Sequence, residues 1–189
     1  GHTVRPDGPR FQIGAASVAL CFCLSTSANS IVVDNVDPGA TATGSWPSAT
    51  AATDHFGTNS RYAASGGGAD SFRFTPDLPA AGPYQVEVWN SCYTPRATDV
   101  PHTIGFDGGS NTVIVDQDAN TGSCAEWMDL GTYDFAAGST GYVEISDAGV
   151  AGGPWIGADA VRFTPVAGCH VTVNVLGDGL RDSLDPRIA

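Results

Sequence analysis

The chain has 189 residues, which is enough for one hydrophobic core of ordinary size and requires no second domain. Its 42% hydrophobic content excludes wholesale disorder, while 24 glycines and 12 prolines without a collagen period predict short strands and many turns. Eight arginines, no lysine and 20 acidic residues give a formal net charge of −12. A surface this acidic repels phosphate backbones, so no nucleic-acid partner is expected.

The most apolar segment lies near the start of the chain, at residues 13–24. Arginines precede it and the small-residue sequence STSANS follows it, which is the pattern of a secretory signal. Two interpretations of residues 1–30 stay open. They are an uncleaved signal, or an apolar arm that adds a strand to another copy and so builds an oligomer or filament. The arm interpretation depends on Phe11, Ile13, Val18, Leu20, Phe22 and Leu24.

From residue 31 to residue 166, apolar and polar residues alternate over short spans, which is typical of half-buried strands. The Asp107-Gly108 turn joins two of these spans and predicts a hairpin. Glycine- and proline-rich segments separate the others, at the spacing of an antiparallel β-sandwich. The alternating spans are residues 71–75, 84–89, 102–106, 111–115, 142–146 and 160–164.

Five cysteines occur without paired CxxC motifs, so disulfides are favoured over a zinc or iron–sulfur site. Cys92 follows one predicted strand and Cys124 precedes another, and both are flanked by small polar residues. This placement favours a Cys92–Cys124 bridge between neighbouring loops, in an oxidising compartment. The odd number leaves at least one cysteine unpaired within the chain.

Several segments, in this order along the chain, resemble the golvesin C-terminal-like domain: IVVDNVDPG from Ile31, FRFTPDLPAAGPYQVEVW from Phe72, EWMDLGTYDFAAGSTGYVEISD from Glu126 and GADAVRF ending at Phe163. The resemblance covers residues 31–166. It implies an all-β, jelly-roll-like module that accompanies secreted polysaccharide-acting enzymes such as xanthan lyases. Here the module lies between the apolar arm and an acidic tail of residues 167–189.

Aromatic side chains supply the flat faces on which sugar rings stack. Trp155, in the loop GGPWIG, and Tyr93, in the loop SCYTPR, are the candidates for contact with a ligand or another subunit, because binding residues concentrate in loops on a rigid scaffold. Trp89 and Trp127 lie at the ends of alternating strands and are expected to be interior.

Two places are candidates for calcium. Asp34 lies near the first predicted strand and Asp159 in the last, so the two carboxylates come together and could bind calcium if these strands are neighbours. The alternative to a calcium site is that each carboxylate accepts backbone hydrogen bonds at the end of its strand. The tail resembles the calcium loop of thrombospondin type 3 and dockerin-like repeats, in which oxygen ligands surround a glycine, here Gly179. Leu176 departs from this pattern, because it occupies position 3 of the loop, where an oxygen ligand is expected. The alternative interpretation is an acidic, turn-rich tail. The candidate ligands of the loop are Asn174, Asp178, Asp182 and Asp185.

No GxSxG motif or other recognisable nucleophile elbow occurs, and the predicted sandwich contains only the histidines His55 and His102. No catalysis is therefore expected. The favoured hypothesis is a secreted structural protein that self-associates through its arm and whose tail binds Ca²⁺. The alternative is a module that binds extracellular polysaccharide.

Overall fold

The computed structural model describes residues 29–151 and 153–166. The candidate residues of the arm and of the tail lie outside the described residues, and the predictions made for them stay predictions: Phe11, Ile13, Val18, Leu20, Phe22, Leu24, Asn174, Asp178, Asp182 and Asp185. In the described part of the chain, no helix is long and apolar enough to cross a membrane.

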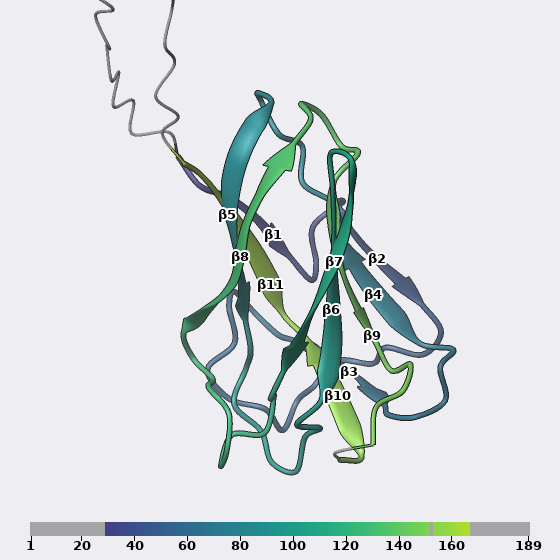
Figure 1. Ribbon diagram of the computed structural model, residues 1–189. Helices are drawn as coiled ribbons and strands as arrows, with labels where there is room; N and C mark the ends of the chain where they lie inside the picture. Colours follow the sequence, from purple (N-terminus) through teal and green to yellow (C-terminus); the bar gives the residue numbers. More distant parts are fainter. Residues whose placement is uncertain (1–28, 152, 167–189) are drawn as a thin grey trace, which may run out of the picture. The chain divides into compact units, whose positions relative to one another are not determined.

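The described fold is built from antiparallel strands, as expected (Figure 1). One sheet, called the first sheet, consists in spatial order of β1 (Ile31–Asp34), β11 (Ala160–Pro165), β5 (Gly82–Trp89) and β8 (Trp127–Phe135). The second sheet consists of β2 (Ala40–Thr43), β4 (Ser71–Phe74), β9 (Tyr142–Ser146), β6 (Val100–Phe106) and β7 (Gly109–Val115). A two-stranded ribbon of β3 (Arg61–Ala64) and β10 (Trp155–Ala158) lies near one end of the two sheets.

The two sheets enclose one hydrophobic core, which confirms the β-sandwich. Alternate residues of β5 and β11 face alternate residues of β4, β6 and β9, because successive side chains of a strand point to opposite faces. Those in the core include Val86, Val88, Val161, Phe163, Phe72, Phe74, Ile104, Val143 and Ile145, all at most 3% exposed. The core thus makes a rigid support for the loops at the ends of the strands.

The structure confirms the alternating spans, which lie in β4, β5, β6, β7, β9 and β11. Asp107-Gly108 forms the turn between β6 and β7, with Phe106 paired to Gly109 and a φ of 88° at Gly108 that favours glycine. The short strands β2, β3 and β10 lie outside the alternating spans, because four residues rich in alanine and glycine carry too little periodic signal.

Candidate functional site

The β3–β10 ribbon presents two aromatic side chains on its outer face. Gly157 of β10 pairs with Tyr62 of β3. Ile156 and Ala63 point into the core, being 0% and 1% exposed, so Trp155 and Tyr62 point outward. The two rings meet edge to face with their centroids 5.5 Å apart. In an edge-to-face pair only one of the two rings uses a face for the contact, so flat aromatic surface remains for other contacts.

Arg96, from the loop between β5 and β6, lies over this ribbon. A Cβ atom at position 157 would be 2.1 Å from Nη1 of Arg96, so only glycine leaves room for the guanidinium. Two backbone hydrogen bonds also hold Arg96 in place. The amide of Ala97 donates to the carbonyl of Trp155 (2.8 Å), and the amide of Arg96 donates to Asp118 Oδ2 (2.8 Å). Arg96 is 3% exposed and therefore forms part of the floor of the site.

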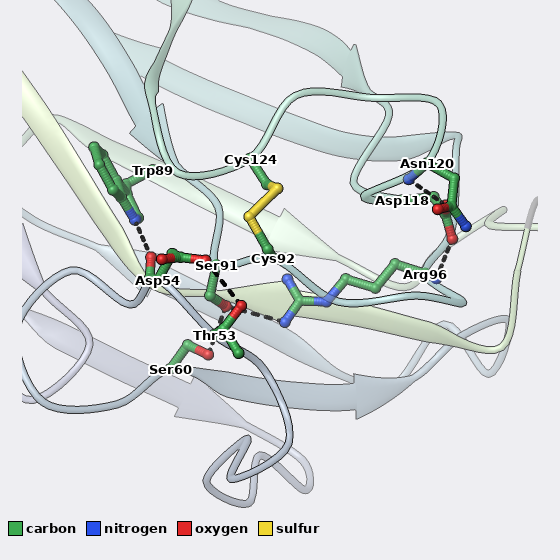
Figure 2. The surroundings of a disulfide bond; sticks show 10 residues. All are labelled: Thr53, Asp54, Ser60, Trp89, Ser91, Cys92, Arg96, Asp118, Asn120 and Cys124. Atoms are coloured by element: carbon green, nitrogen blue, oxygen red, sulfur yellow. Dashed lines mark hydrogen bonds between the residues drawn. A yellow bond between two sulfur atoms is a disulfide. The ribbon is translucent and has the colours of Figure 1, made fainter.

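The Cys92–Cys124 disulfide holds the loops that flank Arg96, in agreement with the prediction (Figure 2). Cys92 also exchanges two backbone hydrogen bonds with Thr53, of 3.0 and 2.8 Å, and so ties down the end of the 47–53 loop. The other end of that loop is tied to β3, because the amide of Tyr62 donates to the carbonyl of Pro47 (3.1 Å). Tyr93 follows the disulfide directly.

A third loop, between β7 and β8, is held in place by the side chain of Asp118. Its carboxylate accepts hydrogen bonds from the backbone amides of Asn120 and Arg96, and these hold the pKa of Asp118 below its usual value. The hydroxyl of Thr94 donates to the same carboxylate at 3.0 Å. One acidic side chain therefore joins the Tyr93–Arg96 segment to the neighbouring loop (Figure 2).

These elements enclose a pocket of about 190 Å³. Its walls are small residues of the 48–52 loop, the three aromatic side chains and Arg96, namely Ser48, Ala49, Thr50, Ala51, Ala52, Tyr62, Tyr93, Trp155 and Arg96. Trp155 and Tyr93, predicted separately as ligand contacts, line the same pocket. Sequence reasoning did not predict Tyr62 and Arg96, whose place depends on strand pairing. The available signal was the nearness of Arg96 to Tyr93 in the chain.

The prediction that Trp89 and Trp127 are interior is wrong. Both are half-buried on the outer face of the first sheet, because Val86 and Val88 take the inward positions of β5. Phe56 covers the two rings, with centroids 6.2 Å from Trp89 and 5.3 Å from Trp127. Polar side chains, among them Arg162 and Glu87, lie beside them on the same face.

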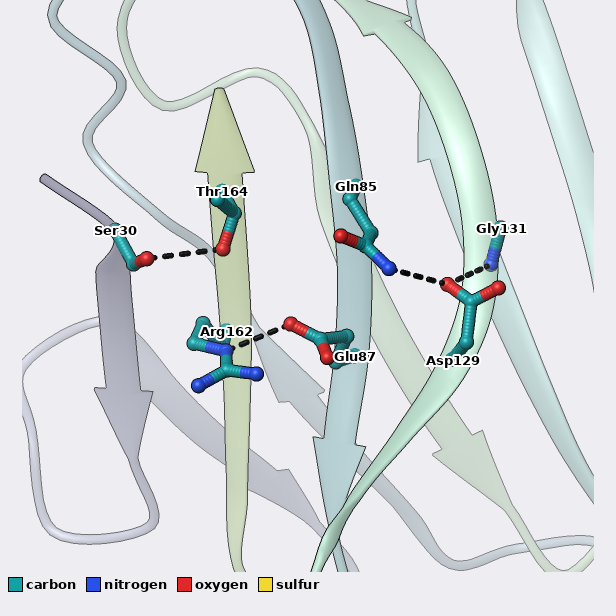
Figure 3. Close-up of polar contacts among 7 residues, drawn as sticks. All are labelled: Ser30, Gln85, Glu87, Asp129, Gly131, Arg162 and Thr164. Carbon is teal, nitrogen blue, oxygen red and sulfur yellow. Dashed lines mark hydrogen bonds and ion pairs between the residues drawn. The ribbon is translucent and has the colours of Figure 1, made fainter. Parts of the chain in front are cut away.

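Paired polar side chains continue along this outer face, as Figure 3 shows. Arg162 donates from Nε to Glu87 Oε2 at 2.7 Å, and Gln85 donates to Asp129 at 3.3 Å. Each of these four side chains therefore has a hydrogen-bond partner on the same face.

The structure pairs β1 with β11, which was the condition for Asp34 and Asp159 to lie close together. Asp34 pairs with Ala160, and the amide of Asn35 donates to the backbone carbonyl of Asp159 (2.8 Å). Burial and, to a lesser extent, the nearby Asp34 carboxylate raise the pKa of Asp159 to about 7, although the backbone hydrogen bond from Phe56 acts in the opposite direction. Burial likewise raises the pKa of Asp34.

Four side-chain oxygens in this region are buried and have no hydrogen-bond partner: Oδ1 of Asp34, Asn35, Asn59 and Asp159. The amide of Phe56 donates to the other oxygen of Asp159, at 3.3 Å. Among the described residues no group of three or more His, Cys, Asp or Glu side chains could hold a metal ion. A cation here would therefore take two carboxylates together with amide oxygens, which are ligands that calcium accepts.

Fold and site together define the class of this protein: an antiparallel β-sandwich module with a small aromatic pocket formed by loops at one end of its sheets. The sequence profile of the Golvesin C-terminal domain matches residues 31–165. The chain belongs to the Golvesin C-terminal domain family.

Similar proteins were found by sequence and by structure. Xanthan lyase of Bacillus sp. (strain GL1) is 39% identical over 141 residues, which are 72% of this chain and 15% of that enzyme. A Paenibacillus xanthan lyase structure matches with a TM-score of 0.67 and 37% identity, covering 72% of this chain and 13% of that one. The Podospora anserina GH26-CBM35 β-(1,4)-mannanase matches with a TM-score of 0.54, 16% identity and coverage of 74% and 28%, a likeness of fold alone.

Proposed function

We propose that this chain is a non-catalytic module that binds a polysaccharide through the pocket of Trp155, Tyr93, Tyr62 and Arg96. The observation that carries the proposal is the pocket itself, because flat aromatic faces beside polar groups hold and orient sugar rings. Its volume of about 190 Å³ lies below that of sites for drug-sized ligands. It therefore suits a single sugar ring of a longer chain.

The composition of the pocket supports binding rather than cleavage. The residues described as lining it include no aspartate, glutamate or histidine. Glycoside hydrolysis uses a pair of such acidic groups, one as the acid and one as the base or nucleophile. His102, the histidine of β6, is fully buried in the core.

The relatives support the same proposal. The matched segment of xanthan lyase is a small part of an enzyme that, by its name, acts on xanthan, a polysaccharide. The disulfide fits an oxidising compartment, so we place the module outside the cell. Self-association through Phe11 and the rest of the apolar arm, favoured from the sequence, is not supported by the comparisons, which favour carbohydrate binding.

Truncating the pocket aromatics tests the proposal. We expect Trp155→Ala to weaken binding to xanthan by about tenfold or more, because truncating an aromatic anchor of a site commonly costs about 2 kcal/mol and about 1.4 kcal/mol is tenfold in affinity. Tyr93→Ala should act in the same direction. Affinity electrophoresis in gels with and without xanthan measures both.

Trp127→Ala is the matched control, since Trp127 is a half-buried tryptophan that lies on the first sheet, outside the pocket lining. Its retardation by xanthan should equal that of the wild type. Loss of binding in Trp127→Ala with retention in Trp155→Ala would move the ligand site to the outer face of the first sheet and contradict the proposal.

Separately, we propose that Asp34 and Asp159 hold a structural calcium ion, because the four buried oxygens beside them have no protein partner. The ion would join β1, the 55–59 loop and the residue before β11. At a free calcium concentration about 100 times the dissociation constant, the ion should stabilise the folded chain by about 3 kcal/mol. Thermal unfolding with added CaCl₂ or EDTA measures this effect.

Two variants separate this site from the tail. Asp159→Asn should unfold at the same temperature with and without calcium, and without the ion it should be at least as stable as the wild type, since it removes one buried carboxylate. Asp178→Asn in the tail should keep the calcium response. The reverse pattern would place the stabilising ion in the tail instead.

A further inference from the structure

The charge of Arg96 has no partner charge close by. In the described part of the chain, ion pairs join Arg73 to Glu144 and Arg162 to Glu87, and Arg96 belongs to neither. Its Nη2 donates to the hydroxyl of Ser91 (3.1 Å), and its Nε is buried without any hydrogen-bond partner. The Asp159 carboxyl raises the pKa of Arg96 without forming an ion pair with it, and the ring of Tyr93 lies with its centroid 6.0 Å from Cζ of Arg96.

A buried cation in this position is energetically unfavourable unless a counter-charge lies close to it. Arg96 is 3% exposed, and burial lowers its pKa to about 10, which leaves the guanidinium charged at neutral pH. Burying a charge without a counter-charge costs several kcal/mol in order of magnitude. Since the described lining of the pocket contains no acid, the missing counter-charge can come from a ligand.

We propose that the pocket selects sugars that carry a carboxylate, such as uronic acids. This inference rests on the proposed function. The faces of Trp155 and Tyr93 hold the sugar ring, and Arg96 receives the carboxylate of that sugar. A guanidinium suits this role because its planar N–H groups match the two oxygens of a carboxylate.

The net charge of −12 opposes the approach of a polyanion, and the preference for a carboxylate must overcome it. Charges on the surface are screened beyond about 8 Å at 0.15 M salt. A carboxylate in the pocket is in direct contact with Arg96 and is screened much less. The preference should therefore be stronger at physiological salt than at low salt, because the long-range repulsion is weaker there.

The test compares two forms of one polymer with the wild-type full-length chain. Xanthan and xanthan whose carboxyl groups have been reduced to alcohols are compared by affinity electrophoresis at 0.15 M salt. We expect binding to the reduced polymer to be weaker by about tenfold or more, which is the range of a charge-assisted hydrogen bond. Glucuronate should compete for the site more strongly than glucose.

Arg96→Gln should bind both forms alike, and Arg96→Lys should keep part of the preference. The wild-type comparison does not depend on whether these variants fold. Equal binding of the wild type to both forms would overturn the carboxylate inference and leave the proposed function in place. Binding to neither form, nor to a panel of neutral and acidic polysaccharides, would overturn the proposed function itself.

Discussion

Replacing Cys92 and Cys124 together by serine should lower the free energy of unfolding by about 3–4 kcal/mol. The two cysteines are 32 residues apart in sequence, and the bridge restricts a loop of that length in the unfolded chain. Urea unfolding of the variant and of the wild type, monitored by tryptophan fluorescence, measures the difference. Wild-type protein reduced with a phosphine should match the variant.

The same change should also weaken ligand binding. Cys92 precedes Tyr93 and shares two backbone hydrogen bonds with Thr53, so the bridge orders both loops of the pocket. Binding should fall under conditions in which the variant is still folded by circular dichroism. An unchanged unfolding midpoint would show that the disulfide contributes little, and unchanged binding would show that the hydrogen bonds suffice to order the loops.

Lowering the pH should destabilise the fold through His102. Its ring is fully buried, Nδ1 lies 3.1 Å from the carbonyl of Val100, and burial lowers its pKa from 6.5 to about 4. Between these two values the unfolded chain binds a proton that the folded chain does not, so stability falls as the pH falls. We expect a loss of about 2 kcal/mol between pH 7 and pH 5 from this residue.

The matched variant is His102→Leu, which cannot titrate and removes Nε2, a buried atom without a hydrogen-bond partner. Urea unfolding of both proteins from pH 8 to pH 5 isolates the contribution of the histidine. Asp159, whose pKa is raised, acts in the opposite direction and is present in both proteins, so it cancels in the difference. Parallel losses of stability in the two proteins would contradict the assignment to His102.

The fold could be predicted in large part because its signals are local. Alternation of apolar and polar residues marked β4, β5, β6, β7, β9 and β11, and the Asp107-Gly108 turn marked the hairpin. The order of strands within the sheets could not be read in this way. Asp34 of β1 pairs with Ala160, at the far end of the described chain, and no local pattern contains that register.

The candidate site was predicted only in part, for the same reason. Trp155 and Tyr93 stood out as aromatic residues in loops, whereas nothing local marked Tyr62 or Arg96. Tyr62 joins the pocket because β3 pairs with β10, and Arg96 joins it because Gly157 leaves space for its guanidinium. Trp89 was misplaced because it is out of phase with Val86 and Val88, which point into the core, and Trp127 pairs with Trp89 and so lies on the same outer face.

The sequence by itself determined that this protein is a β-sandwich and where most of its strands lie, and it favoured a Cys92–Cys124 bridge and the loops of Trp155 and Tyr93 as ligand contacts. These properties depend on residue type and on spacing along the chain. Only the tertiary structure decided that Trp155, Tyr93, Tyr62 and Arg96 line one pocket, and that Asp34 and Asp159 share one buried site. Such groupings depend on strand register, which is set by packing between residues far apart in the chain.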